Sequence, residues 1–166
     1  MKQILDVCCG SKKFWFDKEN ENTEFCDIRN ETIKLCDGRV IEINPNTICD
    51  FRNLPFKDNS YYLVVFDPPH IKNIGEKAFM ALTYGHLNKE TWQEDIRKGF
   101  EECMRVLKPN GVLIFKWNTH DIKVSEIINA IGVQPLFGHK TRATKRSSTH
   151  WFCFMKQVEN DNNKKI

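Results

Sequence analysis

The chain has 166 residues, of which 40% are hydrophobic and 28% charged, and its formal net charge is +3. This length suits one domain with its own core, and no apolar run reaches the ~18 residues of a membrane span, so we expect a soluble protein with no membrane partner. The first residues enter a strand-like segment and form no signal peptide, which favours a cytoplasmic location.

Seven cysteines are present, and four of them, Cys8, Cys26, Cys49 and Cys153, lie within or at the ends of apolar, strand-like runs. Their odd number and their surroundings favour buried, reduced thiols over disulfides, which again indicates a cytoplasmic protein. The adjacent Cys8 and Cys9 cannot form the Cys-x2-Cys loop of a zinc site, and no paired ligand motif follows. We therefore expect no metal.

Runs of β-branched and aromatic residues mark the expected strands. In chain order they cover residues 3–7, 24–28, 40–43, 47–49, 62–66 and 111–117. Two further segments, 135–138 and 150–156, are expected to pair as an antiparallel hairpin around a basic loop.

Two helices are expected between these strands. The first covers residues 89–107, where apolar residues recur at spacings of three and four. The second is capped by Asp121, runs to Ile131 and ends at Gly132. Strands that alternate with helices predict an α/β fold with a Rossmann-like, doubly wound, mostly parallel sheet.

The domain organisation follows from the same pattern. We expect a single domain over residues 1–156. Residues 157–166 are polar and rich in Asn and Lys, so we expect a disordered tail there.

The apolar run 62–66 ends in Asp67-Pro68-Pro69-His70. Proline donates no backbone hydrogen bond and holds the preceding residue in an extended conformation, so the strand stops at Asp67. A carboxylate is thereby presented rigidly at the carboxyl end of a strand. In open α/β sheets, ligands bind at that edge.

Three earlier strands also end in acids, namely Asp6, Asp27 and Asp50. After the first of them only Gly10 is present where a dinucleotide fingerprint needs three glycines, and no phosphate-binding loop occurs, so NAD, FAD and ATP fit badly. Acids at successive strand ends favour a nucleoside with a charged amino-acid tail.

The ordered set of Asp6-Val7-Cys8-Cys9-Gly10, Asp27, Asp50-Phe51 and Asp67-Pro68-Pro69-His70 resembles the class I S-adenosylmethionine-dependent methyltransferases. It is most similar to small phage and prophage amino-methyltransferases, which share Cys8-Cys9-Gly10-Ser11, Phe16-Asp17-Lys18 and Phe115-Lys116-Trp117-Asn118. The resemblance covers residues 3 to about 156. It implies the class I methyltransferase fold, a seven-stranded sheet with a C-terminal antiparallel hairpin.

The resemblance also implies a role for each site residue. The backbone of Cys8, Cys9, Gly10 and Ser11 would hold the methionine part of S-adenosylmethionine, while Asp6 would orient its ammonium group or, alternatively, cap the loop. Asp27 would bind the ribose and Ile28 the adenine face, and Asp50 and the Phe51 amide would bind the adenine edge. Phe14, Trp15 and Phe16 are assigned to the core in preference to a lid.

The implied reaction is methylation of an exocyclic amine. Asp67 and the Pro68 carbonyl would accept hydrogen bonds from its two N–H groups and hold the nitrogen in line with the methyl group. Adenine N6 in DNA is the favoured target. Cytosine N4, an RNA base, a glutamine amide and a non-catalytic methyltransferase-like subunit remain alternatives.

Two features concern the substrate. His70 stands where this family usually carries an aromatic residue, so His70 either stacks on the base or caps the next loop, and Trp117 is either an aromatic wall or core. The cations Lys140, Arg142, Lys145 and Arg146 are expected to bind nucleic acid, and segment 71–88 to close over it. With no room for a recognition domain, target recognition would be short, relaxed or supplied by a partner subunit.

Overall fold

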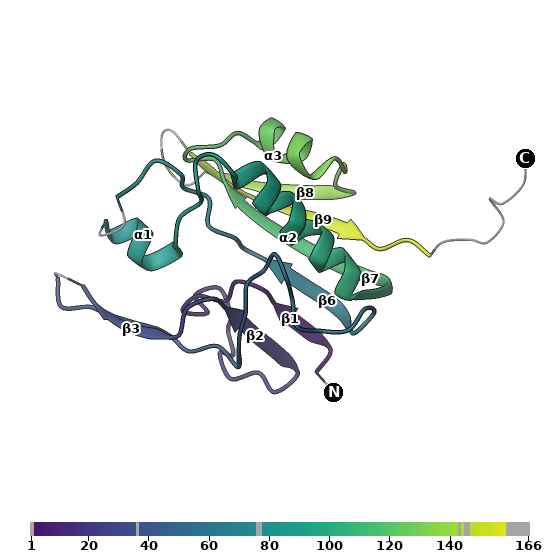
Figure 1. Cartoon of the computed structure of the whole chain (residues 1–166), viewed down its shortest axis with the longest axis horizontal. Helices are drawn as coiled ribbons and strands as arrows, with labels where there is room; N and C mark the ends of the chain where they lie inside the picture. The colour runs from purple at the N-terminus through teal and green to yellow at the C-terminus, as the bar shows by residue number, and fades with distance from the viewer. Residues whose placement is uncertain (1, 36, 76–77, 143, 145–146, 159–166) are drawn as a thin grey trace, which may run out of the picture.

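The computed structural model describes residues 2–35, 37–75, 78–142, 144 and 147–158. Within these residues, seven strands form one sheet in the order β5-β2-β1-β6-β7-β9-β8 (Figure 1). Their bounds are β1 Ile4–Asp6, β2 Thr23–Asp27, β5 Thr47–Ile48, β6 Tyr61–Phe66, β7 Leu107–Asn118, β8 Phe137–Arg142 and β9 Ser148–Met155. The strands from β5 to β7 pair in parallel, and β7, β9 and β8 pair antiparallel. The expected Rossmann-like sheet with its closing hairpin is confirmed.

The strand order places a crevice in the sheet. From β1 the chain moves outward to β2 and β5, then returns to the other side of β1 to form β6 and β7. Such a reversal leaves the loops on the two sides free to diverge at the carboxyl ends of the strands. The carboxyl ends of β1 and β6 are therefore the expected position for a ligand.

Helix α2, Trp92–Val106, confirms the longer expected helix with narrower bounds. It packs across β6 and β7 because a glycine permits close contact: a Cβ at Gly99 would lie 2.5 Å from the Phe51 ring and 2.8 Å from the Phe66 ring. None of the helices in the described part of the chain is long and apolar enough to cross a membrane.

Helix α3, Val124–Ile131, ends at Gly132 as expected, where φ is +70°. The expected cap was wrong. The helix begins after Lys123, whose amide donates to the Glu126 carboxylate at 3.0 Å. Asp121 instead accepts the amides of residues 72 and 73, both at 2.9 Å, and so anchors the loop that follows the Asp67–His70 motif.

A β-hairpin and a short helix lie beside the sheet (Figure 1). The hairpin pairs β3, Glu31–Lys34, with β4, Val40–Ile43, and β3 was not expected from the sequence. Helix α1, Phe79–Tyr84, lies in segment 71–88, which was expected to close over the nucleic acid and in which no helix was expected. Leu82 of α1 packs against a small core formed by the hairpin, so the two elements support one another.

The two faces of the sheet are covered differently. In β7, the residues Leu113, Phe115 and Trp117 have no exposed surface and pack beneath α2 and α3. The alternate residues Ile114 and Lys116 point to the opposite face and are half-buried. That face carries neither α2 nor α3. The segment between β1 and β2 covers part of it.

Candidate active site

A cavity of about 680 Å³ opens at the carboxyl ends of β1, β2 and β6. Its wall includes Gly10, Asp27, Asp50 and Asp67, which follow or end four different strands. Its volume lies in the range of roughly 300 to 1,000 Å³ that is typical of small-molecule sites. The residues expected at strand ends are thus brought together, with the exception of Asp6.

The loop after β1 forms one end of this cavity. The Gly10 amide donates to Asp27 Oδ2 at 2.9 Å, and the Cys9 amide donates to the Cys26 carbonyl at 2.7 Å. Gly10 has φ +49°, in the left-handed region that favours glycine. A Cβ there would meet nothing within 4 Å, so the backbone conformation, and not crowding, explains this glycine.

Asp6 is fully buried beneath the cavity and does not form its wall. Its Oδ2 accepts the Trp15 indole N–H at 2.6 Å, and its Oδ1 accepts the Cys8 amide at 3.3 Å. Burial raises the pKa of Asp6 to about 7, although the Trp15 hydrogen bond opposes this shift. These contacts fit the loop-capping role, and direct binding of a ligand by Asp6 stays a prediction.

Asp27 is held by a residue that the sequence analysis missed. Its Oδ1 accepts both the Arg29 amide at 3.0 Å and Arg29 Nε at 3.2 Å. The next residue, Ile28, is 61% exposed and forms part of the cavity wall, where it offers an apolar surface to a flat ring. An arginine two residues after an acid carries no specific signal in a single sequence.

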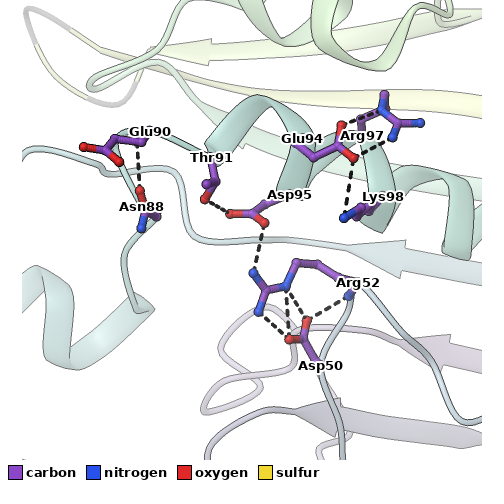
Figure 2. Close-up of polar contacts among 9 residues, drawn as sticks. All are labelled: Asp50, Arg52, Asn88, Glu90, Thr91, Glu94, Asp95, Arg97 and Lys98. Atoms are coloured by element: carbon purple, nitrogen blue, oxygen red, sulfur yellow. Dashed lines mark hydrogen bonds and ion pairs between the residues drawn. The ribbon is translucent and has the colours of Figure 1, made fainter.

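Asp50 belongs to a network that also escaped prediction (Figure 2). Arg52 donates to both Asp50 oxygens at 2.6 to 3.0 Å and to Asp95 Oδ1 at 2.9 Å. Thr91 donates to the other Asp95 oxygen at 2.7 Å. The Arg52 hydrogen bonds lower the pKa of Asp50. The network ties the loop after β5 to the first turn of α2.

Asp67 pairs with a lysine from the neighbouring strand. Lys116 Nζ of β7 lies 2.5 Å from Asp67 Oδ2, and the two side chains expose only 22% and 16% of their surface. Burial raises the pKa of Asp67, while the Lys116 charge and hydrogen bond oppose the shift. Lys116 had been noted only as a member of the Phe115–Asn118 motif.

His70 is buried between two aromatic rings, at 6.0 Å from Tyr84 and 6.3 Å from Trp117. Burial, followed by the charges of Lys116 and His120, lowers the pKa of His70 to about 4, so the imidazole is neutral at physiological pH. Trp117 has no exposed surface and donates its indole N–H to the Ile122 carbonyl at 3.1 Å. Trp117 is therefore core.

Comparison with known proteins places the fold. No family model matches the sequence. The tRNA (carboxymethyluridine(34)-5-O)-methyltransferase of Arabidopsis thaliana is 30% identical over 115 residues, which cover 69% of this chain but only 24% of that protein.

Solved structures are similar over nearly the whole chain. The N-methyltransferase NodS from Bradyrhizobium japonicum WM9 matches with a TM-score of 0.56 and 12% identity, over 95% of this chain and 86% of that one. Geranyl diphosphate methyltransferase in complex with SAM matches with a TM-score of 0.55 and 7% identity, over 95% and 78%. The chain has the class I methyltransferase fold.

The three aromatic residues after β1, Phe14, Trp15 and Phe16, lie in three different environments. Phe16 is fully exposed, so its assignment to the core was wrong. Trp15 packs edge-on against Phe25, with ring centroids 5.1 Å apart. Phe14 borders the cavity and packs edge-on against Trp151 at 5.5 Å.

The last residues of β7 and β8 lie at the same end of the sheet as the cavity. Asn118, the last residue of β7, pairs with Thr149 of β9, and Arg142 of β8 pairs with Ser148. Lys140 and Arg142 are exposed there. Lys145 and Arg146, which were also expected to bind nucleic acid, lie outside the described residues.

The six cysteines that the structure describes all have free thiols. Cys36 lies outside the described part of the chain. Cys26 and Cys153 are buried as expected. Cys8 and Cys49 are half-buried and border the cavity. Across the described ranges, no group of three or more His, Cys, Asp or Glu residues is placed to hold a metal ion.

Proposed function

We propose that this chain is an S-adenosylmethionine-dependent N-methyltransferase that modifies the exocyclic amino group of a nucleic-acid base, with adenine N6 in DNA as the first candidate. The observation that carries the proposal is that Asp67 and Pro68 share one cavity with Gly10, Asp27 and Ile28. A cofactor site and an acceptor for an amine are thereby adjacent.

The cavity wall fits S-adenosylmethionine in its chemistry. A nucleoside with an amino-acid tail needs a carboxylate for its ribose hydroxyls, an apolar surface for its ring and backbone amides for its tail. Asp27, Ile28 and the loop of residues 8–11 supply these groups in that order. When bound, the cofactor supplies an electrophilic methyl group on a sulfonium sulfur.

Asp67 and Pro68 then act on the amine. The lone pair of an exocyclic nitrogen is delocalised into the base ring, so the nitrogen is a poor nucleophile until its geometry changes. A carboxylate and a carbonyl that accept hydrogen bonds from its two N–H groups favour a pyramidal nitrogen and orient the lone pair. The methylated amine is acidic and loses a proton after transfer, for which Asp67 is a nearby acceptor.

Tyr84 supplies an aromatic wall that the sequence analysis assigned elsewhere. It ends α1, borders the cavity and lies beside His70. Its position is fixed by Gly85, where φ is +74° and a Cβ would lie 3.1 Å from Pro69 Cγ. With a neutral His70 next to it, this wall suits an uncharged, planar base.

Two observations support the proposal that the substrate is a nucleic acid. Lys140 and Arg142 are exposed at the edge of the sheet where the cavity opens, and cations bind phosphates without regard to sequence. The Arabidopsis relative is named as a tRNA methyltransferase. That name makes an RNA base the second candidate. In either case the base must be unpaired or flipped out to enter the cavity.

The deciding experiment incubates the protein and labelled S-adenosylmethionine with DNA, RNA and protein pools, followed by nucleoside analysis of the labelled pool. N6-methyldeoxyadenosine is the expected product, and a labelled ribonucleoside amine would favour the second candidate. Asp67→Ala serves as the matched control. Label in protein, or on a base carbon or carboxylate, would overturn the proposal.

A further inference from the structure

Lys116 and Asp67 form an ion pair inside the cavity, and the proposed reaction assigns no role to the lysine. Lys116 Nζ binds Asp67 Oδ2 at 2.5 Å, and both residues border the cavity. Within the described part of the chain, Lys116 is the one cation in contact with Asp67. The second carboxylate oxygen, Oδ1, makes no hydrogen bond to any of the described residues.

We propose that Lys116 is a positioning residue for Asp67: its ammonium group holds Oδ2 and thereby leaves Oδ1 directed to the N–H bond of the methyl acceptor. This inference rests on the proposed function and extends it. A carboxylate at the end of a strand can rotate about its χ2 angle, and an amine held by it would rotate too. Fixing one oxygen fixes the other.

The lysine itself is held in place by its surroundings. The alternation of β7 turns Lys116 to the face opposite α2, where it pairs in register with Trp151 of β9. Its ammonium lies 5.3 Å from the Phe14 ring centroid and 5.6 Å from that of Trp151, within the range of cation–π attraction. Two rings from different elements thus limit where a long, flexible side chain places its charge.

The identity of the cation is also explained. A guanidinium group presents a planar fork that binds both oxygens of a carboxylate, whereas an ammonium is a point charge that engages one oxygen. An arginine at position 116 would occupy Oδ1 as well as Oδ2. Lysine neutralises the carboxylate and keeps one acceptor for the substrate.

The charge of Lys116 has a second effect. Among the described residues, the titratable groups that interact with Asp67 are Asp6 of β1, Cys8 of the loop that follows β1, and Lys116 of β7. Of these, Lys116 alone favours the ionised form of Asp67, because Asp6 is an acid and burial keeps the Cys8 thiol neutral by raising its pKa well above the usual range. A protonated Asp67 would carry an O–H group and would be a poor acceptor for an amine.

The experiment compares the wild-type protein with Lys116→Met and Lys116→Arg. Carboxyl 13C NMR follows the titration of Asp67, with its signal assigned from Asp67→Asn because Asp6 titrates nearby. In Lys116→Met the midpoint of Asp67 should rise by roughly one to three pH units. The acidic limb of the kcat profile should rise with it, so activity returns partly at high pH.

Lys116→Arg should behave differently. The Asp67 midpoint should stay near that of the wild type, yet kcat should fall about tenfold or more at every pH, because Oδ1 is occupied. Lys108→Met is the matched control. It removes another lysine of β7, whose ammonium lies 4.0 Å above the Tyr62 ring, away from the cavity. This control should change neither quantity.

An Asp67 midpoint that does not move in Lys116→Met would overturn the inference, as would full activity of Lys116→Arg. Calorimetric binding of S-adenosylmethionine shows that each variant is folded. The titration is independent of the substrate: if the wild-type protein methylates no nucleic acid, the proposed function fails, while the Asp67 midpoint still decides whether Lys116 governs the carboxylate.

Discussion

Arg29 Nε lies 3.2 Å from Asp27 Oδ1, and the same guanidinium group donates through Nη1 to the Leu82 carbonyl at 3.1 Å. The carboxylate expected to bind ribose is therefore connected through one side chain to α1. Helix α1 also borders the cavity, through Tyr84. Arg29 therefore links the part of the cavity wall that would bind the cofactor ribose, at Asp27, to the part that would contact the base, at Tyr84.

Arg29→Met should loosen this connection. We expect faster hydrogen exchange at the amides of residues 79–84 and about tenfold weaker binding of S-adenosylmethionine, because the variant loses the Nε hydrogen bond to the Asp27 carboxylate and the Nη1 hydrogen bond to the Leu82 carbonyl. Exchange monitored by mass spectrometry and calorimetry measure the two effects. Arg97→Met on the exposed side of α2 is the control, and unchanged exchange in α1 would contradict the prediction.

Asp67→Ala should lower methyl transfer by roughly 100-fold or more, because a preorganised acceptor for the reacting amine is removed. The affinity for S-adenosylmethionine should stay within a few-fold of wild type, since Asp27 and the loop of residues 8–11 remain. Single-turnover rates and calorimetry separate the two quantities. Full activity in this variant would exclude the role proposed for Asp67.

Substitution of both Lys140 and Arg142 by Ala should weaken nucleic-acid binding and flatten its salt dependence. The slope of log K against log salt should fall by about one for each phosphate that the protein no longer neutralises. Fluorescence anisotropy at several salt concentrations measures it. The control is the double Ala variant of Lys57 and Lys108. Lys57 precedes β6 and Lys108 is the second residue of β7, so both lie at the end of these strands that is opposite the cavity. Equal slopes for the two variants would show that Lys140 and Arg142 do not contact phosphates of the nucleic acid.

Asp6 should make the protein less stable as the pH rises. Its pKa is about 7 in the folded protein and roughly 4 in an unfolded chain, so unfolding releases a proton between these values and becomes easier with increasing pH. The loss is on the order of a few kcal/mol and is complete above the folded pKa.

Asp6→Asn should remove most of this slope while keeping an oxygen to accept the Trp15 N–H. Urea denaturation at pH 5 and pH 8 gives the difference in unfolding free energy. Asp17→Asn, at an exposed carboxylate in the segment between β1 and β2, is the matched control for the loss of one acidic side chain. A slope that survives in Asp6→Asn would show that another group causes it.

The main sheet could be predicted because its signals are local. Apolar runs bounded by Pro, Gly or Asp specify β6 and β7, and a spacing of three and four specifies α2. The strand β3 could not be found in this way, since Glu31, Thr32 and Lys34 are polar and its pairing with β4 depends on a small core completed by Leu82.

The site was predictable in its acids and not in their partners. Asp27, Asp50 and Asp67 follow from strand ends, which a sequence reveals. Arg29 and Arg52 meet their acids two residues away along the chain, a spacing that carries no specific signal in a single sequence. Lys116 meets Asp67 only through tertiary placement, between the neighbouring strands β6 and β7. The same limit explains Asp121, which caps well in principle but is turned toward a loop 49 residues earlier in the chain.

The uneven covering of the sheet makes neighbouring positions of one strand differ in their tolerance to substitution. Phe115 is enclosed by the core, so its truncation to Ala should cost about 3 to 5 kcal/mol, whereas Ile114 faces the side without α2 and α3 and should cost markedly less. In energetic terms the domain behaves as two layers, one sheet under one layer of helices. Sequence drift should concentrate on alternate residues of β7, and Lys116, which lies on the permissive side, should be the exception.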